Sequence, residues 1–478
     1  MKSLKQHKVP KWFHDAKLGV FIHWGLFSVP AFATPEAKDI HKNIKEGGWA
    51  WHFKNNPYAE WYLNTLRIPG SPTQKYHQET YGLDFAYEDF VPLFNEACMK
   101  WNPNEWADLF QKVGARYVVL VTKHCDGFCL WPTNYPNPYK ENYIAKRDIV
   151  GELTKAVKTR NMRMGFYYIG PWDWTFNENP IQNFMTYVTN GPLELKFAEY
   201  VKNHWYELID SYEPSILWGD IGYPPVGDEK ELFAYFYNKY PDGVINDRWM
   251  KLGKNTRRLL KFWPIRALVS WLAKRAFIKG SATSLKPPHY DFLTPEYTTL
   301  KKITKDKWET TRGIGHSFGY NQMEPESNYL TVEELVHMFI DIVSKNGNLL
   351  LNVGPKADGS IPEIQKQRLL GLGKWLDVNG DAIFDTRPWK RAEDVTPEGI
   401  PVRYTQKENA LYTILLAKPK GKSVTLKNMS FERKITVILL GDEMPLEIKQ
   451  EGTTLTITLP DDIPSTPAIS LKLSPLPK

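Results

Sequence analysis

Short apolar runs alternate with helical patterns over most of the chain, from residue 18 to about residue 355. Several runs are continuously apolar, which is typical of parallel strands that are buried on both faces. We predict a strand at each of eight runs: 18–25, 117–124, 162–170, 215–220, 243–249, 289–296, 315–320 and 348–354.

The intervals between these runs carry helix signals. Residues 104–114 place their apolar positions on one helical face and end on a glycine. Residues 331–347 open with Thr331 and Glu334 in the spacing of a capping box. Further helices are predicted at 150–160, 197–211, 228–240 and 362–377.

Eight strands joined mostly by helices indicate an α/β fold with a (β/α)8-like barrel. An open, doubly wound sheet is the structural alternative. It is weakened because no GxGxxG motif follows the first strand, so a dinucleotide site is not expected.

The pattern changes after about residue 385. Short β-type runs separated by Gly, Pro, Asn and Asp replace the alternation of strands and helices. This predicts a C-terminal antiparallel β-sandwich. We therefore divide the chain into a barrel domain, 1–385, and a sandwich domain, 386–478.

Composition places the chain among soluble proteins. It has 478 residues, of which 42% are hydrophobic, and no long uncharged apolar window or signal-peptide pattern. Cys98, Cys125 and Cys129 fit a reducing compartment better than a disulfide framework, and their spacing makes a poor zinc site. We expect a cytoplasmic protein without a metal or cofactor.

The net charge of +7 is local in origin. Residues 251–290 hold ten Lys and Arg and no Asp or Glu, so the remainder has 51 basic against 54 acidic residues. The basic character therefore belongs to one insertion, and no nucleic-acid partner is implied.

The insertion also predicts a cationic amphipathic helix that begins near Pro264. The apolar positions Ile265, Leu268, Val269, Leu272 and Ala276 would share one face, and Arg266, Ser270 and Lys274 another. We favour a helix packed on its own barrel or on a neighbouring subunit. A lid over the substrate site comes next, and membrane association is not favoured.

Chemically capable side chains stand at the C-terminal ends of the predicted strands, where barrel enzymes build their active sites. They are His23, His124, Tyr167, Asp220, Arg248 and Glu296. Each has a structural alternative, such as a hydrogen-bonded core histidine or an aspartate that caps a helix. Two carboxyl groups across one site are the equipment of glycoside hydrolysis.

Several motifs together resemble the bacterial α-L-fucosidases of glycoside hydrolase family 29. They include "VPKWFHDAKLGVFIHWG" (9–25), "NPYAEWY" (56–62), "TKHCDGFCLW" (122–131), "GFYYIGPWDW" (165–174), "ILWGDIGYP" (216–224), "DFLTPEY" (291–297), "RGIGHSFGYN" (312–321) and "NGNLLLNVGPKADGSIP" (346–362). The resemblance spans residues 9 to 475.

The resemblance implies a retaining exo-hydrolase that removes terminal α-L-fucose from fucosylated oligosaccharides. By motif position, Asp220 corresponds to the nucleophile and Glu296 to the general acid/base. The implied sugar-binding residues are His23, Glu60, Trp61, His124, Tyr167, Arg248 and Phe318, with Phe318 meeting the C5 methyl group.

Cys125 departs from the family pattern, which has a second histidine after His124. A thiol is a weak hydrogen-bond partner, so activity or specificity is expected to differ. A hydrolase for another galacto-configured glycoside and a non-catalytic sugar-binding protein remain as alternatives. A homo-oligomer is compatible with the fold by analogy alone.

Overall fold

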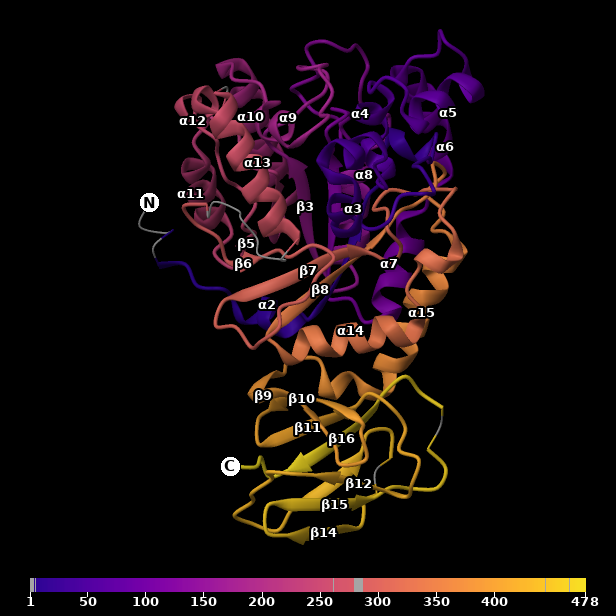
Figure 1. The fold of residues 1–478 in the computed structure, drawn as a ribbon, viewed down its shortest axis with the longest axis vertical. Helices are drawn as coiled ribbons and strands as arrows, with labels where there is room; N and C mark the ends of the chain where they lie inside the picture. Colours follow the sequence, from indigo (N-terminus) through magenta and orange to yellow (C-terminus); the bar gives the residue numbers. More distant parts are fainter. Residues whose placement is uncertain (1–3, 5, 261, 279–286, 443, 464) are drawn as a thin grey trace.

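A closed barrel forms the larger part of the protein. The computed structural model describes residues 4, 6–260, 262–278, 287–442, 444–463 and 465–478. Among these, eight parallel strands pair in the order β5–β4–β3–β2–β1–β8–β7–β6 (Figure 1). The strands are β1 (Leu18–Ile22), β2 (Tyr117–Lys123), β3 (Arg163–Ile169), β4 (Ile216–Asp220), β5 (Val244–Ile245), β6 (Phe292–Leu293), β7 (Lys307–Gly313) and β8 (Gly347–Val353).

Strands β5 and β6 close the barrel although each has only two residues. Asn246 pairs in parallel with Phe292, and the Asp291 N–H donates to the Ile245 carbonyl at 2.8 Å. The Asp291 carboxylate in turn accepts from the Ile245 N–H at 2.8 Å. The predicted barrel is therefore confirmed.

One predicted strand is wrong. Residues 315–320 form a loop, and the seventh strand is β7, with the polar sequence "KWETTRG". Two of its charged side chains are buried: Lys307 donates to the Asn346 carbonyl at 3.1 Å, and Glu309 accepts from the Trp218 indole at 3.0 Å. Because internal partners compensate for burying these groups, the strand lacks the apolar signature.

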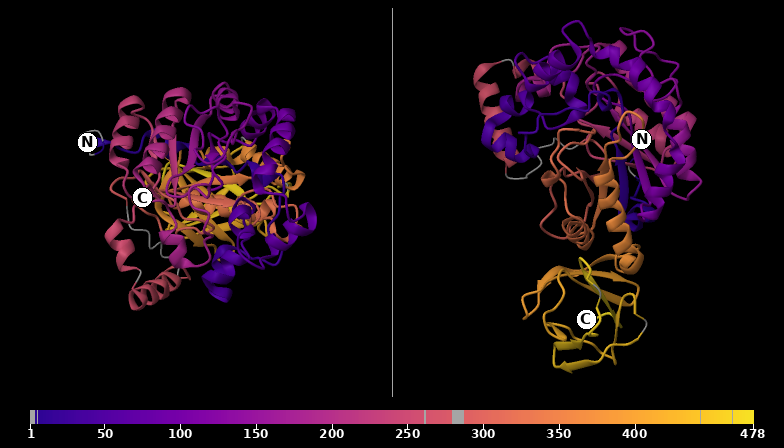
Figure 2. Two further views of the ribbon diagram at one scale, coloured as in Figure 1. Left: turned by 90° about the horizontal axis from the view of Figure 1, so that it is seen from above. Right: turned by 90° about the vertical axis from the view of Figure 1, so that its right-hand side faces the viewer.

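Helices cover the outside of the barrel (Figure 2). The capping box predicted at Thr331 and Glu334 is present at the start of α14, and the other predicted helices are confirmed within a few residues. The helices are α2 (Lys11–Ala16), α3 (Ile40–Lys54), α4 (Tyr62–Leu66), α5 (Pro72–Tyr81), α6 (Phe90–Ala97), α7 (Pro103–Lys112), α8 (Ile149–Lys158), α9 (Phe184–Thr189), α10 (Leu195–Tyr212), α11 (Glu229–Lys239), α12 (Lys254–Leu259), α13 (Trp263–Ile278), α14 (Val332–Ser344) and α15 (Glu363–Asn379).

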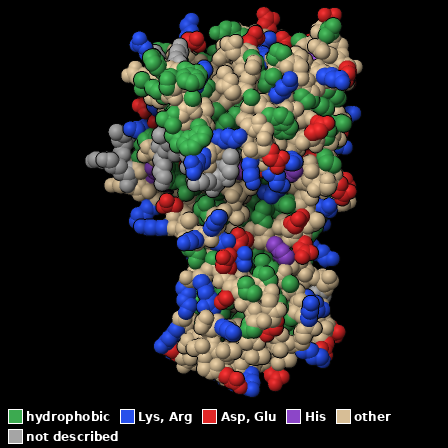
Figure 3. Space-filling model, viewed as in Figure 1, with side chains coloured by type: hydrophobic (Ala, Val, Ile, Leu, Met, Phe, Trp, Pro, Cys, Tyr) green, Lys and Arg blue, Asp and Glu red, His purple; other side chains and the backbone are tan. Residues whose placement is uncertain are grey.

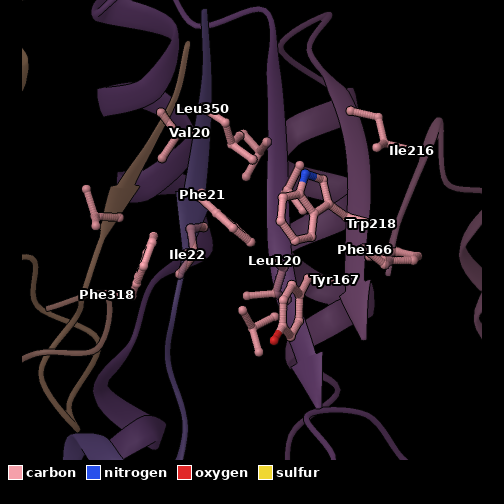
Figure 4. Close-up of a cluster of buried hydrophobic side chains, with 14 of the residues drawn as sticks. Val20, Phe21, Ile22, Leu120, Phe166, Tyr167, Ile216, Trp218, Phe318 and Leu350 are labelled. Atoms are coloured by element: carbon pink, nitrogen blue, oxygen red, sulfur yellow. The ribbon is translucent and has the colours of Figure 1, made fainter. Parts of the chain in front are cut away.

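Aromatic rings fill the barrel between its strands. Phe21 of β1, Tyr167 of β3 and Trp218 of β4 lie together there (Figure 4). The ring centroid of Trp218 lies 5.2 Å from that of Phe21 and 5.6 Å from that of Tyr167. This packing gives the polar groups at the strand ends a rigid floor.

The C-terminal part consists of two antiparallel sheets, as predicted. One has the strand order β13–β16–β11–β10–β9 and the other β12–β15–β14. The strands are β9 (Arg387–Val395), β10 (Pro401–Lys407), β11 (Ala410–Leu415), β12 (Ser423–Leu426), β13 (Thr436–Leu439), β14 (Ile448–Glu451), β15 (Thr454–Thr458) and β16 (Ile469–Ser474).

The two parts are joined through α14 and α15, which lie between the barrel and the sandwich (Figure 1). The Trp375 indole donates to the Ala468 carbonyl at 3.0 Å, and Arg403 donates to Asp341 at 2.6 Å. The division at 385/386 falls in the short link before β9 and stays a prediction.

The basic insertion contains α12 and α13, and α13 packs on its own barrel through α3 and α9. Val269, Ser270 and Lys274 are partly covered in this packing. Leu268 and Leu272, which we placed on the same apolar face as Val269, are exposed. Residues 261 and 279–286 of the insertion lie outside the described residues, and no described helix could span a membrane.

Candidate active site

The two candidate carboxylates come from strands that are separated by one strand around the barrel. Asp220 is the last residue of β4, and Glu296 follows β6 and pairs with Thr311 of β7. Arg248 follows β5, between them in barrel order. Parallel strands deliver their C-terminal ends to one face, so these three side chains meet there.

A single guanidinium nitrogen joins the two carboxylates. Nη1 of Arg248 donates to Asp220 Oδ1 at 3.0 Å and to Glu296 Oε2 at 3.0 Å. Burial disfavours the charge on Arg248, but the carboxylates of Asp220 and Glu296 outweigh it and raise the pKa of Arg248. The arginine is therefore a permanent cation between the two acids.

This shared contact limits the separation of the carboxyl groups. Two oxygens that each lie 3.0 Å from one nitrogen are at most 6.0 Å apart. Retaining glycosidases have carboxyl groups about 5–5.5 Å apart, and inverting ones about 6.5–9.5 Å. The arrangement of Asp220 and Glu296 is therefore of the retaining type.

The other two nitrogens of the Arg248 guanidinium donate to Thr294, two residues before Glu296. Nε donates to Thr294 Oγ1 at 2.9 Å and Nη2 to the Thr294 carbonyl at 3.0 Å. Thr294 in turn donates through its hydroxyl to Asp247 at 2.6 Å. These four hydrogen bonds from its three nitrogens fix Arg248 in one position.

Asp220 accepts two further hydrogen bonds. The Tyr167 hydroxyl donates to Oδ2 at 2.9 Å, and the Ile221 N–H donates to Oδ1 at 2.9 Å. Ile221 has a left-handed backbone (φ 61°), which is rare for a β-branched residue. Tyr297, after the other carboxylate, is also left-handed (φ 50°). Such strain is typical of sites whose geometry is fixed by function.

Tyr58 is a site residue that the sequence did not single out. Its hydroxyl donates to Glu296 Oε1 at 2.9 Å, and its ring lies 5.3 Å from that of Phe318. Tyr58 precedes the predicted pair Glu60 and Trp61 in the motif "NPYAEWY", which was the available signal.

His23 and His124 follow β1 and β2 directly, and their rings lie 6.0 Å apart. Burial lowers the pKa of His23 to about 3 and that of His124 well below its ordinary value, so both are neutral. Asn352 donates to the Phe318 carbonyl at 2.7 Å, so its Oδ1 is free to accept from His23 Nδ1 at 2.6 Å. His23 Nε2 is thereby the acceptor.

Nδ1 of His124 is buried and finds no hydrogen-bond partner among the described residues. The ring stacks on Tyr167 with centroids 5.8 Å apart and an interplanar angle of 8°. A buried polar atom without a partner is costly, and a ligand hydroxyl would satisfy it.

Glu60, Trp61 and Phe318 complete the predicted set. Glu60 is buried in the β1–β2 connection and accepts from the Gly319 N–H at 2.8 Å. Phe318, in the loop after β7, lies 4.9 Å from His23 between ring centroids. Trp61 packs on Trp174 at 5.5 Å.

All nine predicted residues therefore form one contiguous cluster. Its centre is open to solvent, since the side chains of Asp220, Arg248 and Glu296 are 15%, 21% and 25% exposed. Among the described residues, no group of three or more His, Cys, Asp and Glu could hold a metal ion.

Comparison with known proteins agrees with this geometry. The family model "Alpha-L-fucosidase" matches residues 1–381, and "Alpha-L-fucosidase C-terminal domain" matches residues 394–474. The chain belongs to the α-L-fucosidase family. The reaction of this family of glycoside hydrolases is the release of α-L-fucose with retention of configuration, and the resemblance inferred from the motifs is confirmed.

Relatives match over nearly the whole chain. Human plasma α-L-fucosidase is 34% identical over 478 residues, 96% of this chain and 87% of the relative. The structure of Thermotoga maritima α-fucosidase in complex with fucose is 42% identical, has a TM-score of 0.82 and covers 99% of both chains. A T. maritima α-L-fucosynthase in complex with a fucosyl-fucose azide is 42% identical, with a TM-score of 0.83 and 98% coverage of both chains.

Cys125, which we expected to alter activity or specificity, is fully buried next to His124. Burial raises the pKa of its thiol well above the ordinary value, so it is a neutral, weak hydrogen-bond partner. Its carbonyl accepts from the Trp174 N–H at 2.7 Å. The effect of this residue on the fucosidase reaction stays a prediction.

Glu309 is a buried acid beneath the candidate site. The sequence did not single out this residue. It accepts from the Trp218 indole at 3.0 Å and from the Tyr117 hydroxyl. The Trp218 ring in turn supports Arg248, whose Cζ lies 4.9 Å from the ring centroid, and stacks on Tyr167. Glu309 is thus a positioning residue for Arg248 and Tyr167, the two side chains that donate to Asp220.

Substitution of Glu309 tests this arrangement. In Glu309→Leu the Trp218 indole loses its acceptor, at a cost of about 1–3 kcal/mol, and kcat/KM on an aryl α-L-fucoside should fall about tenfold or more. Glu309→Gln retains an acceptor and should stay within about threefold of wild type. Equal activity of both variants would contradict a positioning role, and near-ultraviolet circular dichroism would report the expected movement of Trp218.

The buried carboxyl of Glu60 predicts a pH dependence of stability. Burial raises its pKa from 4.5 to about 8. Between these values the folded chain keeps a proton that the unfolded chain has lost, so the free energy of unfolding falls by about 1.4 kcal/mol per pH unit from this group. Calorimetry should show that the Tm of Glu60→Gln falls less than that of wild type between pH 5 and pH 7.5.

The matched control is Glu199→Gln, at an exposed position of α10, which should follow wild type. Parallel Tm curves for Glu60→Gln and wild type would mean that Glu60 is ionised in the folded protein.

Proposed function

We propose that this chain removes terminal α-L-fucose from fucosylated oligosaccharides with Asp220 as nucleophile and Glu296 as general acid/base. The observation that carries the assignment is the pair of carboxylates within 6.0 Å on one arginine nitrogen. The reaction has two steps, and both use Asp220, Glu296 and water.

In the first step, Asp220 attacks the anomeric carbon while protonated Glu296 donates its proton to the departing glycosidic oxygen. The products are a β-fucosyl ester of Asp220, the free aglycone alcohol and ionised Glu296. The donors from Tyr167, Arg248 and Ile221 hold Asp220 in a fixed orientation for this attack.

In the second step, Glu296 takes a proton from water, and the hydroxide equivalent attacks the same carbon and breaks the ester. Arg248 Nη1 and the Tyr58 hydroxyl, which both donate to Glu296, hold its carboxyl group in place for this step. Two inversions at one carbon release α-L-fucose and restore Asp220.

The remaining cluster suits a deoxy sugar. His23 Nε2 can accept from a hydroxyl, buried His124 Nδ1 needs a polar partner, and Glu60 is protonated below about pH 8 and can donate. Phe318 offers an apolar surface to the C5 methyl group, and Trp61 offers a second aromatic ring to the sugar. Both tryptophan and tyrosine rings suit C–H faces.

The relative named a fucosynthase supports an aspartate nucleophile. That protein is an Asp→Gly variant of the T. maritima enzyme. An enzyme that lacks its nucleophile can form a glycosidic bond from an activated donor without hydrolysing the product, which is the activity that the name describes.

We also place the protein in a bacterial cytoplasm. Its three cysteines are free and buried, which fits a reducing compartment. The identity to the bacterial structures, 42% to 43% for those from T. maritima, exceeds the 34% to the human relative.

The proposal is tested by kcat/KM on an aryl α-L-fucoside for wild type, Asp220→Gly and Glu296→Gly. Both variants should lose several orders of magnitude of activity. Added azide should then separate the two roles. With Asp220→Gly it should give β-fucosyl azide, because azide takes the place of the nucleophile. With Glu296→Gly it should give α-fucosyl azide, because azide attacks the glycosyl-enzyme.

The opposite pair of azide products would exchange the two roles. Unchanged turnover by Asp220→Gly would show that Asp220 is structural. A wild type that is silent on fucosides but cleaves an aryl α-L-galactoside would instead support another galacto-configured substrate, with Cys125 as the first position to substitute by histidine.

A further inference from the structure

Helices α12 and α13 expose an unusual amount of apolar surface. Seven large apolar side chains within 14 residues are between 38% and 71% exposed: Leu259, Phe262, Trp263, Ile265, Leu268, Trp271 and Leu272. We call these residues the α12–α13 surface. Figure 3 shows hydrophobic side chains gathered over these helices, with Lys and Arg among them. Contiguous apolar patches of this kind mark interaction sites.

The surface is held in place from its inner side. Arg257 of α12 is buried and donates to the Gly191 carbonyl at 2.7 Å and to the Thr189 carbonyl at 3.2 Å. α13 rests on α3 and α9 through its other side, where Val269 and Ala273 are partly covered. The apolar side chains on the opposite side of α13 therefore stay exposed to solvent although the helix packs on its own barrel.

Positive charge accompanies the apolar side chains. Arg258, Arg266 and Arg275 are exposed on the same two helices, and Cζ of Arg275 lies 5.2 Å from the Trp271 ring centroid. The segment 251–290 contains no Asp or Glu. On the adjacent α3, the acidic residue Glu46 is already paired with Lys38 at 2.7 Å.

This charge pattern decides between two occupants. A symmetric contact between two copies brings the same patch of each chain together, and here it would place arginines against arginines. An anionic lipid surface supplies the missing negative charge. It also accepts Trp, Phe and Leu side chains at the boundary of headgroups and acyl chains.

We propose that the α12–α13 surface binds anionic lipid membranes, with α13 lying in the plane of the interface. The contact is peripheral, since no described helix could cross a bilayer. The sequence alone did not favour membrane association; the proposal rests on the exposed apolar and basic side chains that remain outside the packing of α13 on α3 and α9. The inference does not depend on the proposed reaction.

Sedimentation with vesicles tests the inference on the full chain. Wild type should bind phosphatidylcholine vesicles containing phosphatidylglycerol, bind pure phosphatidylcholine at least tenfold more weakly, and lose binding as salt is raised. The variant Trp263→Ser/Trp271→Ser and the variant Arg266→Glu/Arg275→Glu should each bind the anionic vesicles at least tenfold more weakly.

The matched control is Leu83→Ser/Leu195→Ser, which removes two leucines that are 80% and 62% exposed in a loop and in α10, and it should bind as wild type. Activity on an aryl α-L-fucoside and Tm should be unchanged in all three variants, which shows that each has folded. Turnover therefore reports the proposed function separately from vesicle binding.

Three results would overturn the inference: no binding by wild type, equal binding to neutral and anionic vesicles, or undiminished binding by the tryptophan variant. Light scattering identifies the rival occupant. If wild type is an oligomer that ignores vesicles, and Trp263→Ser/Trp271→Ser converts it to a monomer, the surface joins copies of this chain.

Discussion

The site depends on the guanidinium of Arg248 between two carboxylates. Two carboxylates at this distance repel each other, and a fixed cation between them removes that cost. The barrel supplies the three groups from β4, β5 and β6, and Thr294 with Asp247 holds the arginine fork. One ion therefore sets both the orientation of Asp220 and its distance from Glu296, which is the quantity that separates retaining from inverting hydrolysis.

The guanidinium of Arg248 rests on a layer of aromatic side chains, and the buried carboxyl of Glu309 holds that layer in place. Trp218 supports Arg248 and stacks on Tyr167, while Glu309 fixes its indole from the far strand β7. Burial raises the pKa of Glu309 to about 7. Preorganised dipoles and charges of this kind stabilise a charged transition state because they need not reorganise during the reaction.

Much of the barrel and of the site could be predicted from the sequence, and the failures have physical causes. Continuous apolar strands and a capping box are visible in the sequence, and strand ends locate His23 and Asp220. Strand β7 was missed because its buried charges are satisfied internally. Tyr58 was missed because its role depends on a contact 238 positions away in the chain. The orientation of α13 followed from its packing on α3 and α9, which periodicity alone does not reveal.

The most direct test of the account is to trap the covalent intermediate with a 2-deoxy-2-fluoro-α-L-fucosyl donor that carries a good leaving group. The fluorine slows both steps, and the leaving group restores the first, so the fucosyl-enzyme accumulates. Mass spectrometry of the digested protein should find one sugar on the peptide that contains Asp220, and the label should be absent from Asp220→Gly. A label on Glu296 or on any other residue, or turnover without a trapped species, would contradict the account.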